Sequence, residues 1–235
     1  MLGWDGELPP PSVRTADDMR PVLRDPSCRC DAPLYFMYRD LAKTDADWHW
    51  LHSHALRYDI TAIPARDLCG ERVKTKGHYH PPNGAGIGYP EIYEVLDGTA
   101  HYLLQSQSLD DVVMLEAGAG DIVIIPPGYG HVTINPSPDR TLVMANIVST
   151  AFESTYSAYE RLQGAAYYEL CSGELVKNPQ YSSVPMVRHL RAKSGTGSHR
   201  IVKGPLYSLI GNEKALAFLN RPEDFAAVFR VLLKD

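Results

Sequence analysis

The sequence has little of what marks several common classes of protein. Only four of its 235 residues are cysteine, too few for the disulfide framework of small secreted domains. The neighbouring pair Cys28 and Cys30 lacks the second pair that a zinc knuckle needs. No apolar run approaches the roughly 20 residues of a membrane-spanning helix. The first residues show no basic segment followed by an apolar one, so no signal peptide is recognised.

A large excess of charge is also missing. The chain carries 28 acidic and 23 basic residues, for a net charge of −5, which argues against a protein built to coat nucleic acid or an anionic membrane. Hydrophobic residues make up 44% of the chain and 14 residues are tyrosine, so wholesale disorder is excluded. We therefore expect a cytoplasmic protein with one sizeable core and without nucleic-acid or membrane partners.

The middle of the chain is a succession of short β-rich runs separated by turn residues. Turns such as Asp97-Gly98 separate several of eight such runs, which are Leu56–Ile63, Arg72–His80, Glu91–Leu96, Ala100–Gln105, Val112–Leu115, Ile122–Ile125, His131–Ile134 and Leu142–Ile147. This density of short strands predicts an all-β antiparallel barrel or jelly roll. No helix-length periodic segment lies between them, which argues against a βαβ sheet.

The flanking segments have a different texture. Residues 1–55 read as a proline-rich arm that contributes one strand at 34–39 and contains an ambiguous stretch at 44–56. Residues 56–150 form the predicted barrel. Residues 151–235 are expected to be a cover and a partly helical extension, with a loop at 192–204 and a final helix beginning at Asn220. The apolar face of that helix comprises Phe225, Val228, Phe229 and Leu232.

Two histidines and a carboxylate occur at alternate positions in neighbouring predicted strands. His78 and His80 share one face of a strand, because residues i and i+2 point the same way. Glu91 and Tyr93 share a face of the next strand, whereas Glu94 points to the other side. If both faces are turned inward, two imidazoles and one carboxylate converge inside the barrel.

A second block supplies a third histidine. Its pattern is Gly120-x5-Pro126-x-Gly128-x2-His131-x3-Asn135, which places His131 on an inward face together with Asn135. Three imidazoles and a carboxylate with open coordination positions suit one divalent transition metal per chain, such as Fe, Mn, Ni, Co or Zn. The sequence thus predicts a metal site made of His78, His80, Glu91 and His131.

These two blocks resemble the two motifs of the cupin superfamily, which implies a cupin β-barrel. The second block matches at every fixed position. The first departs from the pattern, because Arg72 stands where a glycine is usual, and ten residues, Pro81–Pro90, separate His80 from Glu91 where three or four are usual. We expect this proline- and glycine-rich insert to be a loop at the mouth of the barrel, where loops shape access to a site.

A narrower resemblance covers roughly residues 34–160. The segments 75–80, 90–93 and 126–135, with the strand Arg57–Thr61 upstream, are similar to the cupin-type glucose-6-phosphate isomerase of archaea and some bacteria. The resemblance implies that His78, His80, Glu91 and His131 hold the metal, with iron the first expectation. It also implies a small-molecule sugar phosphate as the bound partner, held by Thr61, Thr75, Gly77 and Tyr156, with the positive charge of Lys76 close by.

The implied reaction converts glucose 6-phosphate to fructose 6-phosphate, a step of glycolysis and gluconeogenesis. Glu91 is the base by position, with Tyr93 beside it as a hydrogen-bonding or proton-relaying group; proton abstraction and a hydride shift both stay open. In a regular strand Thr75 faces away from His78, and we expect a bend at Gly77 to relieve this conflict.

Two other functions stay open: a metal-dependent cupin dioxygenase, and a cupin that binds a sugar without catalysis. A phosphate-binding segment favours the isomerase over both. We expect a homodimer, because small cupin barrels pair through exposed strand edges. The remaining histidines of the N-terminal half, His49, His52, His54 and His101, are interpreted as structural or surface residues.

Overall fold

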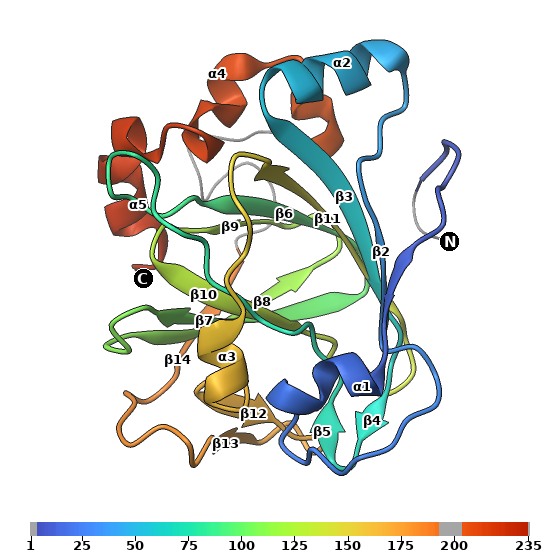
Figure 1. The fold of residues 1–235 in the computed structure, drawn as a ribbon, viewed down its shortest axis with the longest axis vertical. Coiled ribbons are helices and arrows are strands. Elements are labelled where there is room, and N and C mark those ends of the chain that lie inside the picture. The colour runs from blue at the N-terminus through green and yellow to red at the C-terminus, as the bar shows by residue number, and fades with distance from the viewer. Residues whose placement is uncertain (1–3, 193–203, 235) are drawn as a thin grey trace.

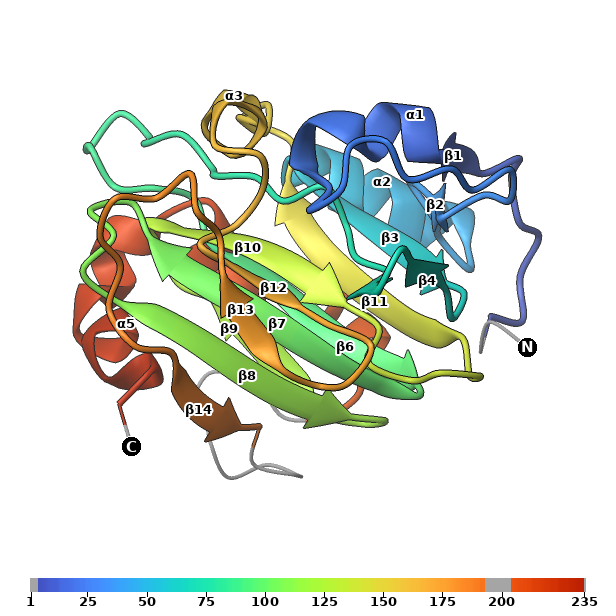
Figure 2. The same ribbon diagram turned by 90° about the horizontal axis from the view of Figure 1, so that it is seen from below.

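Two β-sheets packed face to face form the body of the protein (Figure 1). The computed structural model describes residues 4–192 and 204–234. The first sheet has the order β1-β2-β3-β11-β6-β9, with bounds Ser12–Arg14, Tyr35–Tyr38, Leu56–Ile63, Leu142–Ser149, Glu91–Asp97 and Ile122–Ile125. The second has the order β10-β7-β8-β14 (Figure 2), with bounds Tyr129–Ile134, Thr99–Ser106, Val112–Gly118 and Arg188–Arg191.

All neighbours within the two sheets are antiparallel except β14, which runs parallel to β8. Two small hairpins complete the β structure: β4 with β5 (Asp67–Leu68 and Glu71–Arg72) and β12 with β13 (Tyr167–Glu169 and Leu175–Lys177). The prediction of an all-β jelly roll is confirmed. The predicted strand at 72–80 is the exception, because it is joined to β10 only by isolated bridges at Lys74 and His78.

Helices lie outside this sandwich. The α-helices are α1 (Ala16–Met19), α2 (Asp45–Ser53), α3 (Ser157–Arg161), α4 (Glu213–Leu216) and α5 (Ala226–Leu232). Short 3₁₀ turns are η1 (Arg20–Val22), η2 (Leu206–Leu209), η3 (Ala217–Leu219) and η4 (Pro222–Phe225). The ambiguous stretch at 44–56 is the helix α2, which begins where the Thr44 hydroxyl accepts a hydrogen bond from the Asp47 N–H at 3.1 Å. No helix in these described ranges is long and apolar enough to cross a membrane.

The central strands β3 and β11 of the first sheet are buried on both faces. Between the sheets, side chains such as Tyr93, Tyr102 and Met144 form the main core. The opposite face of β3 and β11 carries Ile60 and Ile147, which belong to one apolar cluster with Leu206 and Phe218 of the C-terminal extension. Strand alternation therefore leaves one set of β3 positions, residues 57, 59 and 61, for the interior of the barrel.

The C-terminal extension corrects two sequence predictions. The final α-helix begins at Ala226 instead of Asn220, and the Asn220 side chain donates a hydrogen bond to the His54 carbonyl oxygen at 2.6 Å. Phe225, Phe229 and Leu232 pack against the outer apolar cluster as the pattern predicted, but Val228 does not belong to it. The predicted loop at 192–204 falls almost entirely outside the described residues.

A disulfide joins Cys28 of the N-terminal arm to Cys69 of the β4–β5 hairpin. This corrects the treatment of Cys28 and Cys30 as a pair, because Cys28 is already bonded 41 residues away. Cys30 and Cys171 are free. The bond ties the arm to the hairpin whose second strand leads directly into the histidine-bearing segment.

A buried ion pair lies at the start of that segment. Lys74 and Glu71 form a salt bridge with side chains 4% and 1% exposed, and the second Glu71 oxygen accepts the Arg24 N–H at 2.9 Å. Lys74→Met should therefore lower the free energy of unfolding by about 3–5 kcal/mol, since it leaves a buried carboxylate without its cation. Urea denaturation followed by circular dichroism measures this.

The exposed Lys177 provides the matched control for this pair. Lys177→Met should change the free energy of unfolding by less than about 0.5 kcal/mol. The double change of Lys74→Met with Glu71→Leu should recover part of the loss, because it removes the stranded charge. Equal stability of the Lys74 and Lys177 variants would contradict a stabilising role for the buried pair.

Candidate metal centre

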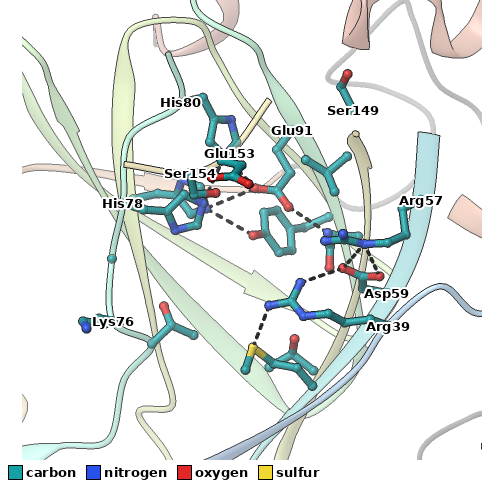
Figure 3. A pocket seen from close by; sticks show the side chains of 18 of the residues that line it. Arg39, Arg57, Asp59, Lys76, His78, His80, Glu91, Ser149, Glu153 and Ser154 are labelled. Atoms are coloured by element: carbon teal, nitrogen blue, oxygen red, sulfur yellow. Dashed lines mark hydrogen bonds and ion pairs between the residues drawn. The ribbon is translucent and has the colours of Figure 1, made fainter. Parts of the chain in front are cut away.

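Four side chains from three separate stretches meet inside the barrel. Glu91 is the first residue of β6, His131 lies within β10, and His78 and His80 come from the segment beside β10. One ligand atom from each residue lies within 4.8 Å of the others. Figure 3 shows the imidazoles of His78 and His80 and the carboxylate of Glu91 directed toward one another. The structure thus brings together the four residues that the sequence singled out.

The donor atoms of this group are arranged as ligands around a cation would be. The Nε2 atoms of His78 and His80 are 3.0 Å apart. Oε2 of Glu91 lies 3.3 Å from Nε2 of His131 and 3.5 Å from Nε2 of His80. That oxygen is buried and has no hydrogen-bond donor among the described residues. A buried carboxylate oxygen facing imidazole nitrogens fits a divalent metal.

Neighbouring groups fix the orientation of two of these side chains. Nδ1 of His80 donates to the Tyr89 carbonyl oxygen at 2.9 Å, which leaves its Nε2 free to coordinate. The Asn146 side chain donates to Oε1 of Glu91 at 2.7 Å. Phe152 packs beside both His80 and Tyr89, with ring centroids 4.4 and 4.7 Å away. Contacts with neighbouring residues therefore hold the carboxylate and the imidazole in place.

The insert Pro81–Pro90 forms a loop, as predicted. Within the loop, Pro82 and Gly88 form a β-bridge. The Asn83 side chain donates to a Glu223 carboxylate oxygen at 2.7 Å, which connects the loop to η4 of the C-terminal extension. This contact gives the extension a structural link to the loop that carries Tyr89.

Burial sets the protonation of the cluster. It lowers the pKa of His80 to about 4 and, with the neighbouring His131 and His80, holds the pKa of His78 well below its usual range. Burial opposes ionisation of Glu91, but the neighbouring imidazoles of His131 and His80 outweigh it and lower the pKa of this carboxyl. At neutral pH His78 and His80 consequently offer unprotonated nitrogens and Glu91 an ionised oxygen, the forms that bind metals.

These pKa shifts predict a loss of stability in acid. The folded pKa of His80 lies below the unfolded value near 6.5, so from pH 6.5 down to about 4 the unfolded chain binds a proton that the folded chain excludes. The metal-free protein should therefore lose about 3 kcal/mol of unfolding free energy over this window from His80 alone. His78 and, at the lower end, Glu91 act in the same direction. Denaturation in the presence of chelator at several pH values measures the slope.

Two variants separate this contribution from general acid unfolding. His80→Gln should make the pH dependence shallower, because it removes a group that titrates differently in the two states. The matched control for the substitution itself is His49→Gln, at an exposed histidine of α2. A slope that is the same in the His80 variant would contradict the buried, neutral imidazole.

The cluster opens onto a pocket of about 340 Å³. All the residues expected to bind the sugar phosphate line it together with the metal-ligand candidates and Tyr93; they are Thr61, Thr75, Lys76, Gly77 and Tyr156. The predicted bend is present, because Gly77 has φ +78°. It lets Thr75 and His78 both face the pocket, which a regular strand forbids.

Three of the residues that line this pocket have interactions that the sequence did not indicate. Lys76 forms an ion pair with Glu160 at 2.7 Å and lies over the Tyr156 ring, so its charge is already compensated within the protein. The Thr75 hydroxyl accepts the Thr133 N–H at 2.9 Å and keeps its own proton for a ligand. Tyr93 lies 3.1 Å from Nε2 of His131, and burial with the charge of Glu91 raises its pKa well above the usual range.

Sequence reasoning missed several residues of the pocket wall, namely Arg39, Arg57, Asp59, Asn146, Ser149, Glu153 and Ser154 (Figure 3). The signal for two of them was available, since Arg57 and Asp59 alternate with Thr61 along one predicted strand. Arg39 could not be recognised in this way, because it follows β2 in the N-terminal arm.

The other histidines interpreted as structural lie outside this pocket. His101 pairs with Glu169 at 2.7 Å between the second sheet and β12. His52 contacts Asp40 at 2.9 Å, and His54 contacts the Trp50 carbonyl oxygen at 2.8 Å. Each has a partner that accounts for its position.

Comparison with known proteins gives one family. The sequence pattern of the glucose-6-phosphate isomerase (GPI) family matches residues 13–186. A curated relative, the glucose-6-phosphate isomerase of Thermococcus litoralis, is 31% identical over 90 residues, which are 38% of this chain and 45% of the relative. The chain thus spans less than half the length of that relative.

Solved structures with similar folds share little sequence with the chain. Oxalate decarboxylase from Bacillus subtilis has a TM-score of 0.35 at 16% identity, covering 52% of this chain and 27% of that one. A protein with a cupin-2 domain from Shewanella frigidimarina has a TM-score of 0.28 at 15% identity, covering 40% and 71%.

Proposed function

The chain belongs to the glucose-6-phosphate isomerase family, and on that premise we propose that it is a metal-dependent aldose–ketose isomerase that interconverts glucose 6-phosphate and fructose 6-phosphate. The observation that carries the proposal is the convergence of three imidazoles and one carboxylate at the base of a pocket large enough for a hexose phosphate. A catalytic site needs this combination of convergent polar groups and a cavity.

The metal-ligand candidates and Tyr93 have distinct roles in this proposal. His78, His80, Glu91 and His131 would hold one divalent transition metal, iron in the first instance with Mn, Ni, Zn and Co as alternatives, which when bound polarises a carbonyl oxygen. Tyr93 keeps its proton at neutral pH, because burial and Glu91 raise its pKa, and its hydroxyl is therefore a hydrogen-bond donor to a sugar oxygen. Glu91 accepts a hydrogen bond from Asn146, which orients its carboxylate toward the reacting carbons.

The phosphate group would lie along the wall formed by Thr75 to Gly77. The Gly77 N–H has no acceptor among the described residues, and the Thr75 hydroxyl has a free proton. Thr61 and Tyr156 line the same space. Backbone and hydroxyl donors of this kind form an anion cradle, to which the Lys76–Glu160 pair adds little net charge.

A coupled assay tests the proposal. Fructose 6-phosphate is supplied with a glucose-6-phosphate dehydrogenase, and NADPH formation is followed before chelation, after chelation and after metal add-back. Chelator-sensitive turnover that a divalent metal restores is the expected result. Absence of turnover with every divalent metal would refute the isomerase, and oxygen uptake with a sugar substrate would support a dioxygenase instead.

The same reaction run in heavy water distinguishes the two chemical routes. Isomerisation transfers one hydrogen between C1 and C2. Proton abstraction by a carboxylate passes through an enediol and introduces solvent deuterium into the product. A hydride shift retains the original hydrogen, so product without deuterium leaves that route open.

We further propose that the enzyme acts in the cytoplasm as a homodimer on this small-molecule sugar phosphate. The arm strand β1 is an edge of the first sheet, and Val13 on it is 39% exposed. Unpaired edges invite strand pairing between chains. Light scattering after size exclusion tests the dimer, and deletion of residues 1–15 should shift it to a monomer.

A further inference from the structure

A row of polar side chains crosses the first sheet beside the metal-ligand candidates. Asp59 on β3 is directly opposite Asn146 on β11, and Asn146 is directly opposite Tyr93 on β6. Arg39 extends this row beyond β2, because Tyr38 is opposite Ile60. Neighbouring strands lie about 4.8 Å apart, so the row leads from Arg39 to the site in three short steps.

One end of this row contacts two metal-ligand candidates. Asn146 donates to Glu91 at 2.7 Å, and Tyr93 contacts His131 at 3.1 Å. At the other end, the Arg39 guanidinium donates to Asp59 at 3.1 Å. The position of the arginine is therefore set by the same strand register that positions the ligands.

Asp59 also binds a second arginine, Arg57. Nε of Arg57 donates to both Asp59 carboxylate oxygens, at 2.8 and 3.0 Å. The Asp59 side chain is 4% exposed, whereas the side chains of Arg39 and Arg57 are 39% and 30% exposed. Two guanidinium groups held by one buried carboxylate leave one net positive charge on this wall of the pocket.

Each of these two arginines also has nitrogen donors that do not bind Asp59. Both terminal nitrogens of Arg57 have no acceptor among the described residues. The second terminal nitrogen of Arg39 faces only the Met37 sulfur at 3.1 Å, a weak acceptor. Both residues line the pocket, on the side away from Lys76 and next to Glu91 (Figure 3).

We propose that Arg39 and Arg57 bind the negative charge that develops on the oxygens of C1 and C2 during the isomerisation, at the end of the substrate opposite its phosphate. The proposal rests on the isomerase function proposed above. The Thr75–Gly77 wall supplies neutral donors for the phosphate, and the Arg39–Asp59–Arg57 wall supplies fixed cationic donors beside the reacting carbons. Donors held in place before the reaction stabilise a developing oxyanion without reorganising.

Substrate analogues that differ only at C1 test this assignment in the full chain, with and without its metal. Gluconate 6-phosphate carries a carboxylate at C1, and glucitol 6-phosphate carries an uncharged hydroxymethyl group there. Calorimetry should show that the wild type prefers the carboxylate. Arg57→Met and Arg39→Met should each reduce this preference by about tenfold or more, with glucitol 6-phosphate bound as in the wild type.

The kinetic readout separates this role from ground-state binding. Loss of a donor that acts on the transition state should lower kcat by about 10²-fold or more with a small change in KM. Arg57→Lys keeps the charge without the planar fork and should recover part of the loss. Arg140→Met is the matched control, since Arg140 is a 62% exposed arginine that pairs with Asp97 at the far end of β6.

Each other outcome has a definite meaning. An equal loss of affinity for both analogues would place the phosphate on the arginines and overturn the assignment. An unchanged preference together with an unchanged kcat would mean that the two arginines have only a structural role, which would also overturn the assignment. If a methionine variant does not fold, the Arg57→Lys variant is used for this comparison. Failure of the wild type to bind either analogue would refute the isomerase itself, and the assignment with it.

Discussion

His131→Ala should abolish isomerase activity, with kcat reduced by at least about 10³-fold, more than the loss expected for a group that only supports a ligand. His131 is 2% exposed, and its Nε2 faces both Glu91 and Tyr93. Its removal takes away one of the four ligand candidates. Coupled kinetics and elemental analysis of the purified variant measure activity and bound metal together.

His101 provides the control for this substitution. It is a histidine of the adjacent strand β7, opposite Ile134 of β10, and it pairs with Glu169 outside the pocket. His101→Ala should retain both bound metal and turnover. A His131→Ala protein that keeps one metal per chain and normal kcat would show that the cluster is not the catalytic site.

The metal-ligand candidates were predictable because their positions depend on local rules. His78 and His80 share a face by strand periodicity, and Glu91 with Tyr93 does the same on β6. The spacing around His131 then supplied the third imidazole, and the resemblance to a cupin motif joined the three stretches. Each of these inferences needs a few neighbouring residues only.

The opposite wall of the pocket depends on sheet order, which the sequence does not reveal locally. Arg39 reaches the site because the arm strand β2 pairs with β3, and Asn146 reaches Glu91 because β11 lies between β3 and β6. Both facts are long-range pairings. The Cys28–Cys69 disulfide belongs to the same category, because its partners come together through the fold.

In the segment 72–80, a single residue interrupts the period-2 alternation of a strand. Its composition favours a strand, and two of its residues, Lys74 and His78, form bridges with β10. Gly77 interrupts the strand with φ +78°. The period-2 pattern therefore places His78 and His80 correctly, but it places Thr75 on the wrong side.

Gly77→Ala should consequently damage both stability and the site. A Cβ at this position would lie 2.6 Å from a Val132 methyl carbon and 2.8 Å from the Tyr159 ring, in a backbone conformation that favours glycine. We expect a loss of about 2–4 kcal/mol in unfolding free energy, from the left-handed backbone and from overpacking together. Because His78 is the next residue, metal affinity should fall as well. Chemical denaturation and metal titration measure the two effects.

Gly120→Ala isolates the backbone part of this cost. Gly120 has φ +86°, and a Cβ there would meet no atom within 4 Å, so its substitution should cost about 1 kcal/mol and leave metal affinity unchanged. The excess loss at Gly77 then measures how rigidly Val132 and Tyr159 hold the segment. Equal losses at both glycines would mean that these neighbours yield to the new methyl group, and that the bend at Gly77, not the packing around it, places His78 beside His131.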